Sequence, residues 1–457
     1  MISQISERLN TAVNRPTWTL KSSSGVTTAL QHIVVHFFVI AFQISTGIIT
    51  GRILGPTGKG EQAAMILWPL VLSNAMIMGL PSSLIYNLKR YPEEKSQLIS
   101  AVLMLGGAFA AVAALIGIVF IPHLMRSYSA DVIHSAQWFM LYTPVGVILL
   151  ISIAALRAED DFTSPSIFSF FTSFITLIVL CLLALAGMLT PLTAGLTYLL
   201  GILPAFCWLF KRMWRLFCPR WRNIRSSCQR LLRYGLRSYG IDLMGALSTQ
   251  VGQVLVVSFL PPAAMGLYVV AYSLSRMLDV FQYGIVTVLF PKAAARSTEE
   301  VVAMTGRAAR VGAALFVSAG IALALLCPML LRLLYGSEYV EAVSMLRILL
   351  IEMVLTSATS ILAQAFMALG RPGTVTILQG IGLGLSIPLM LVLIPRYGLV
   401  GAGLALLCSS LVRLIFILIS YPLFLKVHPP ALLLNLKDLE VISKLLKQAK
   451  TLGSSSI

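Results

Sequence analysis

Long apolar segments alternate with short polar connections along almost the whole chain. A run of about 20 apolar residues, folded as a helix, is long enough to cross a hydrocarbon core of roughly 30 Å. Twelve such runs occur in the sequence, at residues 29–51, 63–86, 98–125, 133–156, 164–187, 190–210, 236–260, 267–290, 311–334, 342–368, 374–394 and 399–425. The pattern predicts an all-α, polytopic membrane protein with about twelve transmembrane helices.

The composition agrees with this prediction and argues against an enzyme. Of the 457 residues, 58% are hydrophobic and only 11% are charged, whereas soluble domains carry about 25% charged residues. The longest connection between predicted spans, residues 211–235, is too short for a soluble catalytic domain. Residues 1–28 are polar, and the apolar run that follows is too long for a signal-peptide h-region and lacks a small-residue cleavage site. We therefore expect no signal peptide and no enzyme activity.

The distribution of positive charge predicts how the chain crosses the membrane. If the N-terminus is inside, 25 of the 34 Lys and Arg residues fall in inner segments. Only four fall in outer loops, and these are Arg52, Lys59, Arg126 and Arg396. Because positively charged loops stay in the cytoplasm during insertion, both termini are predicted to be cytoplasmic. The net charge of +17 then reflects topology, and no nucleic-acid partner is expected.

The segment KRMWRLFCPRWRNIRSSCQR, residues 211–230, combines basic residues with tryptophans. The same combination occurs in nucleic-acid-binding patches. In a membrane protein, however, it favours a cytoplasmic hinge that lies on anionic lipid headgroups. We interpret residues 211–235 as a basic cytoplasmic linker between two parts of the chain.

The stretch ILGPTGKGEQ, residues 53–62, resembles a phosphate-binding loop at first sight. A Walker loop reads G-x-x-x-x-G-K-[ST] and connects a strand to a helix. Here Gly55 and Gly58 are two residues too close, Gly60 replaces the magnesium-binding hydroxyl, and both flanks are hydrophobic. The six cysteines also lack the spacing of metal ligands. No nucleotide, metal or other cofactor is predicted.

The same turn recurs later in the chain and indicates an internal repeat. LGPTGKG at 54–60 and LPPAAMG at 260–266 share Leu, Pro and Gly at a constant offset of 206 residues. Proline ends one helix, and glycine allows the turn before the next. Two six-helix halves with an even number of spans would be parallel repeats, with a substrate site in a central cavity between them.

Five segments follow from this organisation. They are a cytoplasmic N-terminal segment (1–28), a first six-helix half (29–210), the basic linker (211–235), a second six-helix half (236–425) and a cytoplasmic tail (426–457). Within the tail, ALLLNLKDLEVISKLLKQAK reads as an amphipathic helix on the membrane surface.

The eighth predicted span carries a stripe of polar residues. They are spaced 4, 4, 3 and 4 residues apart, which places them on one helical face: Tyr268, Tyr272, Arg276, Asp279 and Tyr283. A charge near the middle of a span costs roughly 2.5–3.5 kcal/mol and needs a partner or a wet cavity. Arginine can bind phosphate oxygens bidentately, and phenols can bind sugar hydroxyls. The stripe is a candidate substrate-binding face; the alternative is an internal Arg276–Asp279 ion pair.

Arg413, in the twelfth predicted span next to Ser409 and Ser410, is a second candidate phosphate ligand. It could instead be the structural partner of a carboxylate. The seventh span holds Asp242, a candidate site for a coupling proton or cation that could equally pair with Arg237.

Two further ion-coupling candidates, besides Asp242 and Asp279, are His36 and Glu352. His36 shares a helical face with His32 and Gln43 and can titrate near physiological pH; a hydrogen-bonded packing role is the alternative. Glu352 lies five residues from Arg347 in the tenth span and is expected to pair with neighbours or to contact water.

Three segments carry a family resemblance: ILGPTGKGEQAAMILWPL, MGLYVVAYSLSRMLDVFQYGIVTVLFP (265–291) and ALGRPGTVTILQGIGLGLSIPLMLVLIPRYGLVGAGLALL (368–407). In this order they resemble polysaccharide repeat-unit flippases of the multidrug/oligosaccharidyl-lipid/polysaccharide exporter (MOP) superfamily. The resemblance implies that an oligosaccharide on a polyprenyl diphosphate moves from the inner to the outer leaflet of a bacterial cell (inner) membrane. It also implies a role in surface or exopolysaccharide biosynthesis, with the lipid-linked oligosaccharide and membrane lipids as partners.

Two other functions and one further set of partners stay open at this point. An ion-coupled multidrug antiporter would share the fold but prefer an anionic cavity; Arg276 and Arg413 argue against it, whereas Asp242 and Asp279 keep it open. A polysaccharide polymerase or ligase is disfavoured because the outer loops are short and no nucleophile–base arrangement occurs. A polysaccharide polymerase and its chain-length machinery remain open as protein partners.

Overall fold

The computed structural model describes residues 25–221, 224–293 and 296–430, and within them every regular element is helical. The longer helices are α2 (Gly25–Met76), α3 (Leu80–Arg90), α4 (Lys95–Leu124), α5 (Ala130–Phe139), α6 (Thr143–Ala158), α7 (Thr163–Leu185), α8 (Pro191–Leu200), α9 (Leu203–Phe217), α10 (Arg225–Phe259), α11 (Pro262–Ser275), α12 (Asp279–Ala293), α13 (Thr298–Leu334), α14 (Val343–Ala368) and α15 (Pro372–Ser420). Short helical turns connect some of them: η1 (Pro92–Glu94), η2 (Met140–Tyr142), η3 (Arg276–Leu278), η4 (Ser337–Ala342) and η5 (Tyr421–Leu425).

The described residues contain nine helices that are long and apolar enough to cross a membrane. A tenth is counted if α10, which bends by 51° between residues 225–240 and 243–259, is one span. This confirms the prediction of an all-α, multi-span membrane protein. The count is lower than the predicted twelve because α2 and α15 each cover two predicted spans without an interruption in helical structure.

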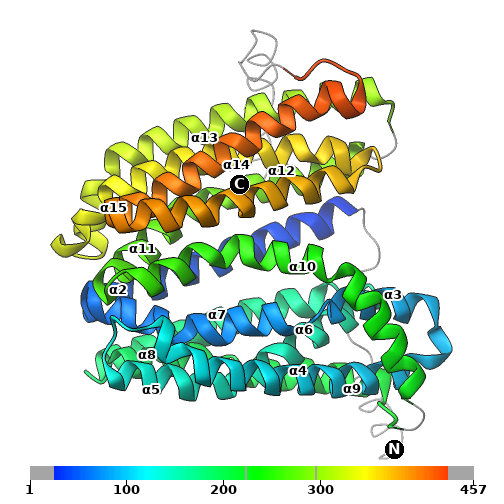
Figure 1. The fold of residues 1–457 in the computed structure, drawn as a ribbon, viewed down its shortest axis with the longest axis horizontal. Coiled ribbons are helices and arrows are strands. Elements are labelled where there is room, and N and C mark those ends of the chain that lie inside the picture. The colour runs from blue at the N-terminus through cyan, green and yellow to red at the C-terminus, as the bar shows by residue number, and fades with distance from the viewer. Residues whose placement is uncertain (1–24, 222–223, 294–295, 431–457) are drawn as a thin grey trace, which may run out of the picture.

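Both long helices contain a glycine at which the chain reverses. In α15, Gly398 has φ 57° and ψ −132°, and Ser409 donates a hydrogen bond to the carbonyl of Gly382 at 2.8 Å. In a straight helix these two residues would lie about 40 Å apart. In α2, Gly55 has φ 67° and ψ −179°. Figure 1 shows the chain turning back at the left-hand end of the molecule in both helices.

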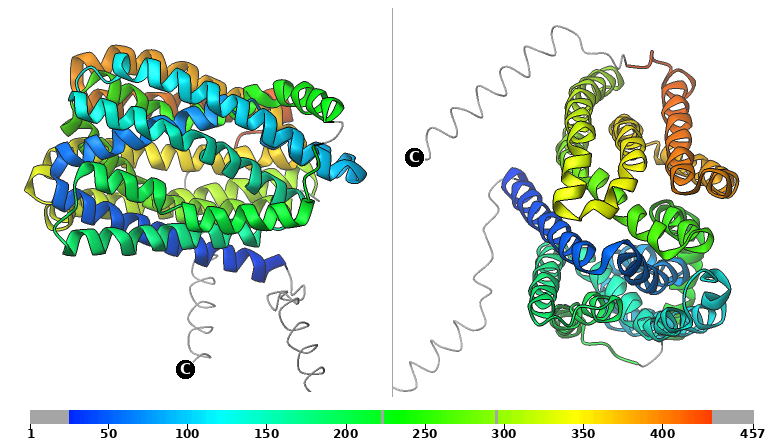
Figure 2. Two further views of the ribbon diagram at one scale, coloured as in Figure 1. Left: turned by 90° about the horizontal axis from the view of Figure 1, so that it is seen from below. Right: turned by 90° about the vertical axis from the view of Figure 1, so that its left-hand side faces the viewer.

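The helices form two groups that lie side by side (Figure 1). We call α2–α9 the N-terminal bundle and α11–α15 the C-terminal bundle. Helix α10 packs against α3 and α4 of the first and against α15 of the second, so it bridges the two. In the end-on view of Figure 2, the first part of α2, in dark blue, lies between the groups.

The two ends of the molecule are named after the segments that lie there. The end with Gly55 and Gly398 is called the kink end, and the opposite end, where the described chain starts and stops, is called the basic end (Figure 1). The predicted linker 211–235 includes the end of α9 and the start of α10. Both of these segments lie at the basic end.

The repeated turns pack directly against each other at the kink end. A Cβ atom at Gly60 would lie 1.7 Å from the carbonyl oxygen of Pro262, and one at Gly266 would lie 1.9 Å from that of Pro56. The contact is reciprocal, because each turn places its glycine on the proline carbonyl of the other. Only glycine allows backbones to approach so closely. The two bundles are therefore in tight contact at this end, along what we call the seam between α2 and α11–α13.

Lys59, predicted to lie in an outer loop, is buried with 6% of its surface exposed. Its Nζ donates hydrogen bonds to Thr50 Oγ1 at 2.7 Å and Gln62 Oε1 at 3.0 Å, and it lies 5.8 Å from the ring centroid of Tyr198. The chain reversal at Gly55 places the lysine against the helix that precedes it. The lysine thus stabilises the turn.

Candidate functional site: a polar cavity in the C-terminal bundle

A cavity of about 390 Å³ lies between α2, α12, α14 and α15. Its polar lining residues are His36, Asp279, Gln282, Tyr283, Thr359, Ser360, Gln364, Gln379 and Arg413. Helix α14 contributes its C-terminal part, and α15 contributes its first turns together with Arg413 from the part that follows Gly398. The cavity therefore lies in the part of the bundle nearer the basic end, below the contact that joins the bundles at the kink end.

Arg276 is not among the residues that line this cavity, and it is paired with a carboxylate from another helix. Its Nη2 donates to Glu352 Oε2 at 2.8 Å, and its guanidinium lies 4.8 Å from the ring centroid of Tyr272. Glu352 is 2% exposed. The predicted alternatives for Arg276 were an open cavity face and a pair with Asp279. The structure shows neither, since the partner comes from α14, 76 residues further along the chain.

Two hydroxyls connect Glu352 to a second arginine. Thr356 Oγ1 and Ser410 Oγ donate to Glu352 Oε1 at 2.6 and 2.9 Å. Arg413 Nη2 donates to the same two hydroxyl oxygens at 3.1 and 2.9 Å. The carboxylate of Glu352 thus binds the guanidinium of Arg276 directly and that of Arg413 through the two hydroxyls. With Glu352 ionised, these three side chains together carry one net positive charge. Arg413 is the cation of the network that lines the cavity.

The predicted tyrosine stripe is split between two environments. Tyr268 and Tyr272 stack with ring centroids 5.8 Å apart and an interplanar angle of 10°, and Tyr268 is 1% exposed. Asp279 and Tyr283 line the cavity. Two of the five residues thus line the cavity, and the other three do not. The 3₁₀ turn η3 lies between the two groups, at Arg276–Leu278.

Among the described residues that line the cavity, His36 is the one that belongs to the N-terminal bundle. Its ring centroid lies 4.9 Å from that of Tyr283 in α12, so it contacts the opposite wall across the seam. Asp242 belongs to α10, at the bend between residues 225–240 and 243–259. The side chains of Asp242 and His32 are outside those that the structure describes.

Sequence reasoning missed the amides of the cavity. Gln282, Gln364 and Gln379 come from three different helices and line it together. Gln282 Oε1 is buried and has no hydrogen-bond partner among the described residues. An amide offers both donors and acceptors, which suits sugar hydroxyls. The available signal was the presence of glutamines inside apolar spans, but their convergence could not be read from spacing within one helix.

The fold is that of known membrane transporters of the MOP superfamily. The lipid II flippase MurJ in an inward closed conformation is similar over 88% of each chain, with a TM-score of 0.75 and 15% sequence identity. An inward-facing multidrug resistance transporter of the MATE family superposes over 82% of this chain and 91% of its own, with a TM-score of 0.66 and 15% identity. At such identities the likeness establishes the fold alone.

The sequence then identifies the family. The pattern of the family described as polysaccharide biosynthesis protein matches residues 49–344, well over half of the chain, and the chain belongs to this family. A probable low-salt glycan biosynthesis flippase of Haloferax volcanii, Agl15, is 24% identical over 212 residues. That match covers 45% of this chain and 44% of the relative, so it spans less than half of the relative's length. The chain thus belongs to a family of polysaccharide biosynthesis, and it shares its fold with a lipid II flippase and a multidrug resistance transporter.

Proposed function

We propose that this protein is a flippase that moves polyprenyl-diphosphate-linked oligosaccharide repeat units from the inner to the outer leaflet of a bacterial cell membrane. The observation that carries the proposal is the composition of the cavity. Arg413 lines it without a carboxylate partner among the described residues, and three glutamines surround the same space. A cation for the diphosphate and amides for the sugars are the two kinds of group that this substrate requires.

The proposed orientation places the basic end in the cytoplasm. The bias of Lys and Arg toward the predicted inner segments supports it. The described chain also begins and ends at the basic end (Figure 1), as expected for an even number of crossings. The cavity would then be reached from the cytoplasm, where lipid-linked oligosaccharides of this class are assembled, while the polyprenyl chain stays in the bilayer.

Transport would proceed by alternating access, in which the bundles rock against each other. The contact of Gly60 with Pro262 and of Gly266 with Pro56 is the barrier that must open on the outer side. An inside-negative membrane potential favours outward movement of the anionic headgroup by about 2.3 kcal/mol per charge per 100 mV.

Among the ion-coupling candidates, Asp279 and His36 line the cavity, whereas Glu352 is engaged by Arg276, Thr356 and Ser410. Asp279 is therefore the coupling group that we favour.

An ion-coupled multidrug antiporter is the second candidate. Asp279 and His36 are the observation in its favour, because a carboxylate in a cavity can bind a cationic drug or a proton. The excess positive charge of the Arg276–Glu352–Arg413 network weighs against it, since it would repel cationic drugs from the neighbouring space.

The first test is a deletion strain in which both functions are measured in the same cells. We expect lipid-linked oligosaccharide to accumulate on the cytoplasmic leaflet, with unchanged tolerance of cationic drugs. Complementation with Arg413→Ala should fail to restore export, while Arg413→Lys should restore part of it because the charge is kept. Arg347→Ala is the matched control: this arginine of α14 is exposed, and its one hydrogen bond to a described residue goes to the carbonyl of Ala324 at 3.3 Å. Drug hypersensitivity with normal surface polysaccharide would contradict the flippase function and support the antiporter.

A second test addresses the movement. Gly60→Ala places a methyl group on the carbonyl of Pro262, so the kink end can no longer close as described. We expect the variant to shift toward a state that is open at the kink end, measured as increased labelling of a single cysteine placed at this end. Gly245→Ala, at a helical glycine of α10 with open space around it, is the control. Unchanged labelling in Gly60→Ala would contradict the assignment of this contact as the barrier.

A further inference from the structure

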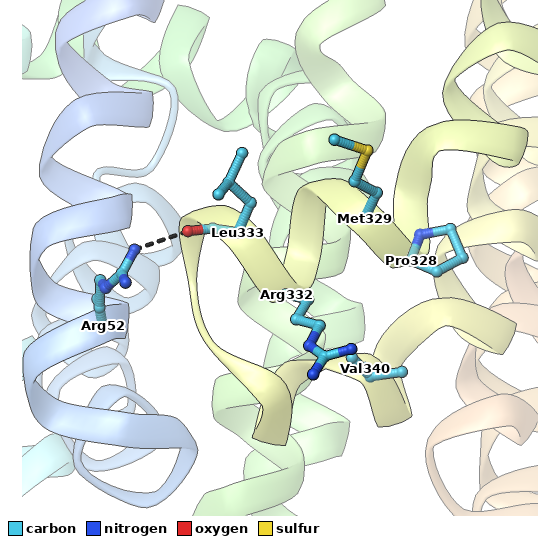
Figure 3. A pocket seen from close by; sticks show the side chains of 6 residues that line it. All are labelled: Arg52, Pro328, Met329, Arg332, Leu333 and Val340. Atoms are coloured by element: carbon cyan, nitrogen blue, oxygen red, sulfur yellow. Dashed lines mark hydrogen bonds between the residues drawn. The ribbon is translucent and has the colours of Figure 1, made fainter.

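A second pocket lies at the kink end, on the seam between the bundles and separate from the cavity. It has a volume of about 610 Å³. Its lining consists of two arginines and an apolar wall: Arg52, Pro328, Met329, Arg332, Leu333 and Val340. Figure 3 shows Arg52 reaching from α2 to the last turn of α13, with the guanidinium of Arg332 beside Val340. The two arginines thus come from different bundles and border one space.

Most of the hydrogen-bond donors of these arginines are unused. Arg52 Nη1 donates to the carbonyl of Leu333 at 2.6 Å, and no ion pair among the described residues involves Arg52 or Arg332. The nearby carboxylate of Glu338 lies against the kink at Gly55 instead. Each guanidinium has five N–H donors. The pocket therefore offers positive charge and several free donors on a face where the sequence otherwise carries few cations.

An exposed apolar ridge on α13 leads to this pocket. It consists of residues spaced four apart whose side chains are 40–75% exposed: Val317, Ile321, Leu325, Met329 and Leu333. In a membrane-spanning helix such side chains contact acyl chains. Arg332 stands at the end of the ridge, next to Leu333 and near the last turn of α13. Apolar side chains along the span with arginines at its end form the pattern that an acyl chain and its headgroup would contact.

We propose that this pocket binds the phosphate of an anionic membrane lipid, with an acyl chain along the α13 ridge. Guanidinium groups suit the ligand because they bind phosphate oxygens bidentately and are weakly hydrated. A single phosphate held by Arg52 and Arg332 links α2 to α13. Because the two arginines belong to different bundles, the bound lipid stabilises the arrangement in which the kink end is closed. The lipid composition of the membrane thus biases the conformation of the transporter.

The proposal is tested on the purified full-length chain by native mass spectrometry from detergent. Phosphatidylglycerol and phosphatidylcholine are titrated separately onto the wild type, Arg332→Gln, Arg52→Gln and the control Arg347→Gln. We expect one phosphatidylglycerol to bind more tightly than phosphatidylcholine in the wild type and in the control. Its affinity should fall at least five-fold in each pocket variant. Because Arg332 makes no hydrogen bond or ion pair with the described residues, Arg332→Gln decides the outcome if Arg52→Gln fails to fold.

A third series distinguishes the lipid from a free anion. Inorganic phosphate is added to the complex with phosphatidylglycerol, and we expect no displacement at millimolar concentration, because inorganic phosphate lacks the acyl chain that contacts the ridge. Displacement would overturn the lipid assignment and leave a site for a soluble phosphate. Equal retention of phosphatidylglycerol in the wild type, both pocket variants and the control would overturn the site itself. Neither result depends on the transported substrate, so the proposed flippase function would be unaffected.

Discussion

Two regions of the molecule hold ion pairs in opposite surroundings. At the basic end, the described residues form four pairs near the surface, each between a helix and a nearby turn: Lys89–Asp160, Lys95–Glu159, Arg212–Asp161 and Arg230–Glu94. Inside the C-terminal bundle, the described side chains form one pair, Arg276–Glu352, whose carboxylate side chain is 3% exposed. The side chains of Lys89 and Asp160, by contrast, are 53% and 75% exposed.

This difference shows that the number of ion pairs in a region does not indicate how much the removal of one charged side chain would destabilise the fold. A pair in contact with water gains about 0–1 kcal/mol, because solvent and salt screen it. A buried pair has already lost its hydration, so removal of one partner costs about 3–5 kcal/mol, whereas replacement of both by apolar groups can be neutral. The single buried pair is therefore the region where one substitution has a large effect, and it is also the region next to the cavity.

Replacement of the buried carboxylate should give the largest effect. Glu352→Leu leaves Arg276 and Arg413 without the carboxylate that serves both, so we expect a loss of about 3–5 kcal/mol in the free energy of unfolding. Equilibrium unfolding in detergent micelles measures it. The control is Glu341→Leu, at an exposed glutamate of η4. A loss below about 1 kcal/mol would show that the pair behaves like those at the basic end.

The double variant Arg276→Met with Glu352→Leu should be more stable than Glu352→Leu alone, although it carries one more substitution. Removal of the guanidinium eliminates the buried, unpaired charge, and residues in direct contact show coupling energies of about 0.5–3 kcal/mol. A double-mutant cycle under the same conditions determines the coupling. Strictly additive losses would contradict an interaction between the two side chains.

A surface pair should give a much smaller effect. Lys89→Ala removes the partner of Asp160, and we expect at most about 1 kcal/mol, decreasing as salt is added because exposed charges are screened. The same unfolding measurement at two ionic strengths tests this. A loss above about 2 kcal/mol that does not depend on salt would remove the contrast between the two regions.

The smallest expected effect is a dependence on pH at the basic end. Burial acts to raise the pKa of Asp161, but hydrogen bonds from the side chain and backbone N–H of Ser164 and the charge of Arg212 outweigh it, so the pKa is lowered. An acid with a lowered pKa in the folded state stabilises the fold above its unfolded-state pKa of about 4, and this contribution is lost as the pH falls through the folded value. Unfolding between pH 5 and pH 3 should therefore be less pH-dependent in Asp161→Asn than in the wild type. An equal pH dependence in both proteins would contradict the prediction.

The apolar runs predicted the helical, multi-span class, because the cost of burying an unpaired backbone in a bilayer leaves few alternatives to long helices. The number of continuous helices was harder to predict. Gly55 and Gly398 reverse the chain with one non-helical residue inside α2 and α15. The apolar runs predicted interruptions at residues 52–62 and 395–398, where the two glycines lie, but they do not show that helical structure continues up to a single non-helical residue.

The candidate site was predicted only in part. Arg413, Asp279, Tyr283 and His36 line the cavity as candidates, because an ionisable or polar side chain in a span needs a partner or a polar space wherever it lies. The partner itself could not be predicted. Spacing within the eighth span suggested Asp279 for Arg276, whereas the observed partner is Glu352 on a separate helix.

The sequence by itself determined the membrane class, the bias of positive charge, the repeated Pro–Gly turn and the presence of costly polar groups in the spans. Each of these depends on composition or on residues close together in the chain. Only the tertiary structure decided that the repeated turns pack on each other, that three glutamines share one cavity and that Glu352 serves two arginines. These contacts join residues tens to hundreds of positions apart, so the spacing of residues within one helix does not predict them.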